Sequence, residues 1–114
     1  MIYFSLSTMF VVYRYAPDGK LEAFGVPGSA PGKFGVVASV AVDGDGNIFV
    51  SDRLRNVVLM FDRDLNFIDE FGYRGDSKGN LVIPDDIAID PHQHRLYVAQ
   101  AAKRGVSVFT IKAN

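Results

Sequence analysis

The sequence contains no cysteine and no tryptophan. Without cysteine the chain forms neither disulfides nor thiolate metal sites, but this absence does not identify a cellular compartment. An excess of charge of one sign is also missing, because 12 basic residues stand against 13 acidic ones and the formal net charge is -1. A chain without a uniform positive electrostatic field is poorly suited to hold a polyanion. We therefore do not expect nucleic acid as a partner, except at a local basic patch.

Long apolar runs with targeting features are missing as well. Residues 1–13 are mostly apolar and uncharged, but the first basic residue, Arg14, follows this stretch instead of preceding it. A signal peptide carries its basic residues first and ends in a cleavage site of small residues. A membrane span needs about 20 apolar residues. We therefore expect neither a signal peptide nor a membrane span in this chain, and its localisation stays open.

A repeat of about 47 residues organises the sequence. Of the 114 residues 48% are hydrophobic and 22% charged, which is typical of a folded chain and not of a disordered one. The matching segments are Phe24-Gly25 with Phe71-Gly72, Val40–Asp43 with Ile87–Asp90, Ile48–Val50 with Leu96–Val98, and Val58–Phe61 with Val106–Phe109. The apolar start, Ile2–Ser5, matches Ile48–Ser51 and is an earlier copy of the same unit.

Each copy alternates short β-branched and aromatic runs with turn residues, which predicts strands and no helix. In the complete copy we expect four strands, at residues 37–42, 47–51, 57–61 and 67–71. The run Val57–Phe61 has no polar alternation, so both faces of that strand should be covered. Four short strands in a period of about 47 residues are typical of a β-propeller blade, which is a four-stranded antiparallel sheet.

Several motifs of this unit also match a known repeat. They are Gly32-Lys33-Phe34, Val40-Ala41-Val42-Asp43, Gly46–Asp52, Val58, Phe61-Asp62 and Phe71-Gly72, and the next copy adds Ile83–Asp90. These motifs resemble the NHL repeat family, and the resemblance implies a six-bladed β-propeller. The sequence departs from the family where the aspartate after the second strand, Asp52, becomes Leu6 and Gln100 in the other copies. The Asn and Arg that the family places before the third strand are also replaced here.

The chain is too short to close such a ring, so we predict an all-β fold of about 2.5 blades. The expected units are a partial blade at residues 1–25, a complete blade at 26–72 and a blade without its outer strand at 73–114. Open blade edges would permit self-association. Either the chain is a truncated longer propeller, or separate copies assemble into a ring. We favour truncation, because closed assemblies need blade numbers that tile and terminal repeats that cap.

The connections of an antiparallel meander emerge on two opposite sides, and these sides differ in charge. One side carries seven basic and two acidic residues, and the other carries three basic and six acidic ones. On the basic side we predict a binding surface for a protein partner or an anionic ligand, because such a rim attracts negative charge. Its candidate residues are Arg53, Arg55, Tyr73, Arg74, Lys103 and Arg104.

Two segments suggest metal sites, but neither fits well. Asp43–Asn47 begins like a calcium loop, yet position six would be Ile48 and position twelve Leu54, which cannot supply the closing carboxylate. His92 and His94 follow Asp90 in the equivalent hairpin, where exposed histidines are commoner than ligands. We assign no metal, no cofactor and no catalytic residue, and catalytic motifs such as GxSxG and HExxH are missing.

The expected function is therefore a non-enzymatic NHL-type propeller segment that serves as a protein-interaction or scaffold module. One alternative is a fragment of a propeller lyase or hydrolase whose active-site residues lie in other blades. A further alternative is RNA binding, which some NHL domains carry out on a basic face.

Overall fold

A computed structural model describes residues 1–5, 10–73, 79–101 and 105–111. These residues form ten strands and no helix. The strands are β1 (Ile2–Ser5), β2 (Val12–Tyr15), β3 (Leu21–Phe24), β4 (Val37–Val42), β5 (Ile48–Asp52), β6 (Val57–Phe61), β7 (Phe67–Gly72), β8 (Pro84–Asp90), β9 (Arg95–Gln100) and β10 (Gly105–Thr110). Within the described ranges no helix has the length and apolar character needed to cross a membrane.

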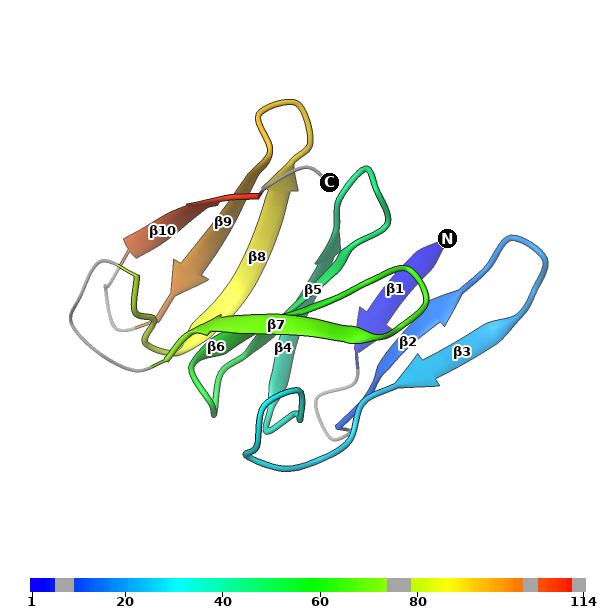
Figure 1. The fold of residues 1–114 in the computed structure, drawn as a ribbon, viewed down its shortest axis with the longest axis horizontal. Helices are drawn as coiled ribbons and strands as arrows, with labels where there is room; N and C mark the ends of the chain where they lie inside the picture. The colour runs from blue at the N-terminus through cyan, green and yellow to red at the C-terminus, as the bar shows by residue number, and fades with distance from the viewer. Residues whose placement is uncertain (6–9, 74–78, 102–104, 112–114) are drawn as a thin grey trace.

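The strands form three antiparallel sheets that follow one another along the chain (Figure 1). The first sheet has the order β1-β2-β3, the central sheet β4-β5-β6-β7 and the last sheet β10-β9-β8. Strand β4 contacts β1 on one side and β8 on the other, so the central sheet lies between its two neighbours. The prediction of an all-β chain built from successive blade-like sheets is confirmed.

The repeat also predicted the strand positions well. Strands β4 and β6 have the expected bounds, β5 begins and ends one residue later than expected, and β7 extends one residue further. The extra residue of β5 is Asp52, which pairs with Val57 across the β5–β6 ladder. The period-based assignment succeeded because every strand of the central sheet has an aspartate or asparagine directly before or after it.

The central sheet has two apolar faces, and each belongs to a different core. Along β6, Val57, Leu59 and Phe61 join the core shared with the first sheet. The intervening Val58 joins the core shared with the last sheet, and Met60 packs against it. Successive side chains of a strand point to opposite faces, so an unbroken apolar run fills both cores. This confirms that both faces of the Val57–Phe61 strand are covered.

The repeated Phe-Gly pair at the end of the outer strand has a packing role. Gly72 has a φ of +116°, and a Cβ atom there would lie 2.7 Å from Leu81 and 2.9 Å from the Asn56 carbonyl oxygen. Gly25, one repeat earlier, has a φ of +127°, and its Cβ would lie 2.5 Å from the Phe34 ring. Only glycine fits where the backbone passes so close to a core side chain with positive φ.

The connections between strands gather at two opposite ends of the sheets. We call one end the loop face; it comprises the β5–β6 turn, the β3–β4 connector and the described parts of the β1–β2 and β7–β8 connections. The other end, which we call the turn face, comprises the β2–β3, β4–β5, β6–β7 and β8–β9 turns. In Figure 1 three of these four turns lie toward the top and the β3–β4 connector lies at the bottom.

Candidate functional site

The loop face is held together by hydrogen bonds between segments far apart in the sequence. The Arg53 amide in the β5–β6 turn donates to the Val36 carbonyl at 3.0 Å. At the other end of the same turn, the Asn56 side-chain oxygen accepts a hydrogen bond of 2.7 Å from the Ile83 amide in the β7–β8 connector. The β5–β6 turn therefore joins the connectors on both sides of the central sheet.

Asp52 organises the centre of this face. Its side chain is fully buried at the end of β5. Its carboxylate accepts hydrogen bonds from the amides of Gly35 and Val36 in the β3–β4 connector, and from those of Leu54 and Arg55 in its own turn. A buried carboxylate is costly unless it is well hydrogen-bonded, and four backbone donors meet that need. Asp52 thus fixes the path of both segments.

Arg55 and Glu70 form a buried bidentate ion pair beside this carboxylate. The Arg55 Nη2 and Nη1 atoms lie 2.5 Å and 3.0 Å from the two Glu70 oxygens. The side chains are only 8% and 3% exposed, respectively. Arg55 also donates to the Lys33 carbonyl at 2.6 Å. Because a planar guanidinium matches a carboxylate in a bidentate pair, this contact fixes the orientation of both side chains and also balances their charges.

Glu70 accepts two further hydrogen bonds, from the Gly32 amide at 2.9 Å and from the Tyr73 hydroxyl at 3.0 Å. Burial raises the pKa of the Glu70 carboxyl, but the hydrogen bonds from Arg55, Gly32 and Tyr73 outweigh burial and leave its pKa below the ordinary glutamate value. The same contact raises the pKa of the Tyr73 phenol, because its proton is held by the carboxylate. We call Arg55, Glu70 and Tyr73 the Glu70 cluster.

The structure describes three of the six predicted binding residues, and each of the two arginines among them forms an ion pair with an acidic residue. Arg55 and Tyr73 belong to the Glu70 cluster, and Arg53 lies 3.2 Å from Asp85 in an exposed ion pair. Among the described residues of the loop face, Lys33 is the basic residue that forms no ion pair. The other three predicted residues, Arg74, Lys103 and Arg104, lie outside the described residues.

Apolar side chains surround a hollow of about 480 Å³ on this face. Its lining residues come from the β1–β2 connection, the β3–β4 connector and the β5–β6 turn, and they are Phe10, Gly28, Ser29, Phe34, Gly35, Leu54 and Arg55. Leu54 is 66% exposed and Phe10 is 48% exposed. The hollow therefore combines a buried aromatic floor, Phe34, with exposed apolar walls.

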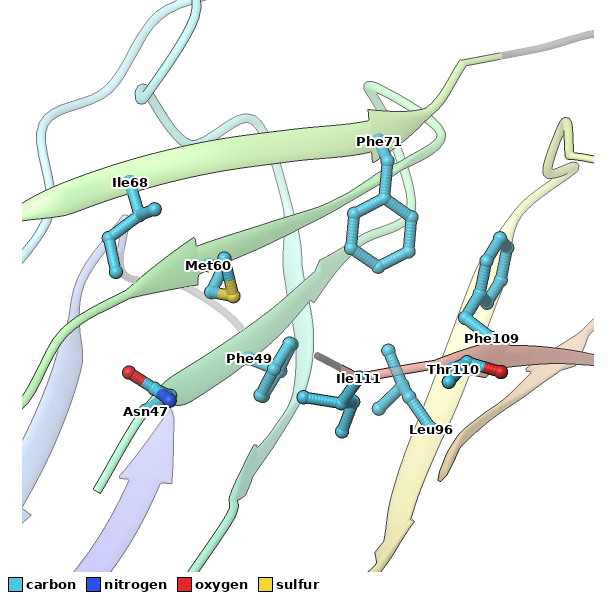
Figure 2. Close-up of a pocket in the computed structure, with 9 residues that line it drawn as sticks. All are labelled: Asn47, Phe49, Met60, Ile68, Phe71, Leu96, Phe109, Thr110 and Ile111. Atoms are coloured by element: carbon cyan, nitrogen blue, oxygen red, sulfur yellow. The ribbon is translucent and has the colours of Figure 1, made fainter. Parts of the chain in front are cut away.

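A second hollow, of about 350 Å³, lies between the central and last sheets. Figure 2 shows Phe49, Met60 and Phe71 from the central sheet opposite Leu96 and Phe109 from the last. The Phe71 and Phe109 rings are 4.8 Å apart. On the opposite side of the central sheet the corresponding space is filled by the contacting rings of Phe24, Phe34, Phe61 and Phe67.

The turn face keeps its aspartates in local contacts. The Asp43 carboxylate accepts hydrogen bonds from the amides of Asp45 and Asn47, both at 2.9 Å, so this segment forms a hairpin turn between β4 and β5. Asp90 likewise accepts hydrogen bonds from the His92 and Gln93 amides. Over the described part of the chain, no three His, Cys, Asp or Glu side chains lie in an arrangement that could hold a metal ion.

No family model matches the chain, and no curated protein matches it. The fold and the contacts of the loop face are therefore the basis for any functional assignment.

Sequence reasoning missed Glu70, whose carboxylate accepts four hydrogen bonds, as many as that of Asp52. Glu70 lies in the middle of β7, where we expected a strand position and counted no loop charge. Its neighbour in sequence, Asp69, points to the other face of the sheet, because side chains alternate along a strand. An available signal was Glu70 itself, a charged residue one position before the Phe-Gly pair in an apolar strand.

Proposed function

We propose that the chain is a stack of β-propeller blades of the NHL type that acts as a non-enzymatic protein-interaction module through its loop face. The all-β succession of blade-like sheets and the 47-residue repeat support the propeller interpretation. The observation that carries the functional part is the apolar hollow on a loop face whose backbone is fixed by Asp52 and the Glu70 cluster.

A rigid rim around an exposed apolar hollow suits a protein partner that inserts an apolar side chain. Such anchors in pockets provide most of the binding free energy in many interfaces. A preformed site also avoids the entropic cost of ordering loops on binding. Because Arg53 and Arg55 are already paired, the attraction for an acidic partner residue rests among the described residues on Lys33. The partner we expect is therefore an apolar peptide segment with a neighbouring carboxylate.

A peptide library displayed on phage tests this proposal. Peptides selected on the wild-type chain should contain an apolar anchor, and the variant Leu54→Asp should bind them about tenfold or more weakly. The matched control is Ile68→Asp, which replaces an exposed apolar residue of β7, outside the loop face. Its affinity for the same peptides should equal that of the wild type.

Two results would overturn the proposal. One is a selection that enriches no peptide, or peptides that bind Leu54→Asp as well as the wild type. The other is that the wild type binds a labelled single-stranded RNA at low salt and that Leu54→Asp loses both RNA binding and peptide binding. This result would favour the alternative in which the loop face binds RNA. Absence of RNA binding at low salt would support the protein-interaction role.

A further inference from the structure

The first sheet exposes an apolar surface on the side away from the central sheet. Cross-strand pairing places these residues on one face: Ile2 is opposite Tyr15, Phe4 is opposite Tyr13, and Tyr15 is opposite Leu21. Ile2 and Leu21 are 62% and 56% exposed. The Phe4 and Tyr13 rings stack with their centroids 5.2 Å apart. We call this surface the head face.

The last sheet exposes a second apolar surface, also directed away from the central sheet. Val108 is opposite Tyr97, and Tyr97 is opposite Ala88, so the three side chains share one face. Val106 lies on the same face two residues before Val108, and these two valines are 61% and 53% exposed. We call this surface the tail face. The two faces lie at opposite sides of the molecule in Figure 1, because the first and last sheets flank the central one.

The repeat shows what each face is built to contact. A shift of 46 residues carries the head-face residues Ile2, Phe4, Tyr13 and Tyr15 onto Ile48, Val50, Leu59 and Phe61. These four residues belong to the core in which the central sheet packs against the first sheet. Each head-face residue therefore occupies the position of a side chain that is buried against a preceding sheet.

The tail face has the complementary relation. Shifts of 47 and 48 residues carry Ala88, Tyr97, Val106 and Val108 onto Ala41, Phe49, Val58 and Met60. These residues form the central sheet's side of the core shared with the last sheet. The chain therefore builds the same type of sheet-on-sheet interface twice. The head face and the tail face are the two halves of a third such interface, and both are exposed.

The sequence patterns alone favour a truncated longer propeller over assembly of copies. From the two complementary faces we infer that the tail face of one copy of this chain packs on the head face of a second copy. The contact continues the two interfaces already present within the chain, and it is heterologous, because different surfaces meet. A heterologous contact closes into a ring when its rotation allows it, and two copies supply six sheets, within the usual range of about four to eight blades. Two equivalent tail-to-head contacts then join the two copies.

The inference uses surfaces other than the loop face, so it stands or fails apart from the proposed partner binding. Contiguous exposed apolar surface is rare on soluble monomers and usually marks an interface.

Light scattering coupled to size-exclusion chromatography tests the pairing with one variant of each face. The wild-type chain should elute with twice the mass of one chain. Phe4→Asp on the head face and Val108→Asp on the tail face should each be monomeric, because either change places a charge in both contacts of the ring. An equimolar mixture of the two variants should regain a dimer with one chain of each, through the single contact in which both surfaces are intact.

The control is Leu54→Asp, which charges an exposed leucine of the loop face and should remain dimeric. Far-UV circular dichroism checks that each variant folds, and Ile2→Asp with Val106→Asp repeats the test if one of the first pair does not. The inference is overturned if the wild type is monomeric up to roughly 100 µM, well above the Kd of a stable contact. A larger assembly, a dimer formed by either variant alone, or a mixture without mixed dimers would also overturn it.

Discussion

The loop face and the turn face hold their acidic residues in different ways. On the turn face, Asp43, Asp62 and Asp90 accept hydrogen bonds from backbone amides two to four positions ahead in the same turn. On the loop face, the Asp52 carboxylate binds amides 16 and 17 positions away, and Glu70 binds Gly32, 38 positions away. These aspartates of the turn face therefore each shape one hairpin, whereas Asp52 and Glu70 join separate segments. Substitutions should reveal this difference as local or global loss of stability.

The largest expected effect is that of Asp52→Ala. The substitution leaves four backbone amides without their acceptor in a buried site, which should lower the free energy of unfolding by about 4 kcal/mol. The matched change on the turn face, Asp43→Ala, should lower the free energy of unfolding by about 1 kcal/mol, because the amides that Asp43 accepts from can hydrogen-bond to water instead. Urea denaturation of both variants measures the difference. Equal losses would show that the two faces do not differ in the way their contacts suggest.

The second effect concerns acid stability. Glu70→Gln keeps the shape of the side chain but leaves Arg55 without its counter-charge, and it should lower the free energy of unfolding by about 3 kcal/mol at neutral pH. Because the pKa of Glu70 is lowered in the folded chain, its stabilisation is complete above the unfolded pKa of about 4.3 and is lost as the pH falls through the lower folded value.

The wild type should therefore lose stability from about pH 5 downward, and Glu70→Gln should lose less over that interval. A weak dependence of stability on pH should remain in Glu70→Gln, because hydrogen bonds from the Asn66 backbone and side chain also lower the pKa of Asp62 on the turn face. Thermal denaturation at pH 7, 5 and 3.5 gives the two profiles. Parallel profiles for wild type and variant would contradict the assigned role of Glu70.

The smallest expected effect separates two arginines of the loop face. Arg53 and Asp85 are 51% and 43% exposed, and Arg53→Ala should change the free energy of unfolding by less than about 0.5 kcal/mol. Arg55→Ala, two positions away, removes one partner of a buried pair and should cost about 3 kcal/mol. Chemical denaturation at 0.1 and 0.5 M salt gives both values. A cost for Arg53→Ala comparable to that for Arg55→Ala would show that burial does not decide the contribution of these pairs.

Much of the fold could be predicted from the sequence, because the repeat and the strand pattern are local signals. The apolar run Val57–Phe61 by itself indicates two covered faces, and the Phe-Gly pairs mark the strand ends. These features depend on alternation and on turn residues, which neighbouring positions in the chain specify.

The contacts of the loop face could not be predicted in the same way. Arg53 and Arg55 look alike in sequence, but one is exposed and the other is buried against Glu70, 15 positions later. Their difference follows from the register of β7 and the path of the β3–β4 connector, which brings Gly32 to the same carboxylate. A count of loop charges cannot include such pairing, so it overestimates the free positive charge of this face.

Ser39 and Asp86 occupy the same position one repeat apart, and the Ser39 hydroxyl donates to the Asp86 carboxylate at 2.8 Å. Side chains at this position therefore meet their own counterparts in the neighbouring sheet. Two copies with aspartate here would set like charges against each other. A sheet with aspartate at this position is therefore compatible with a neighbour that carries a hydroxyl there, whereas a second aspartate would carry a cost in folding.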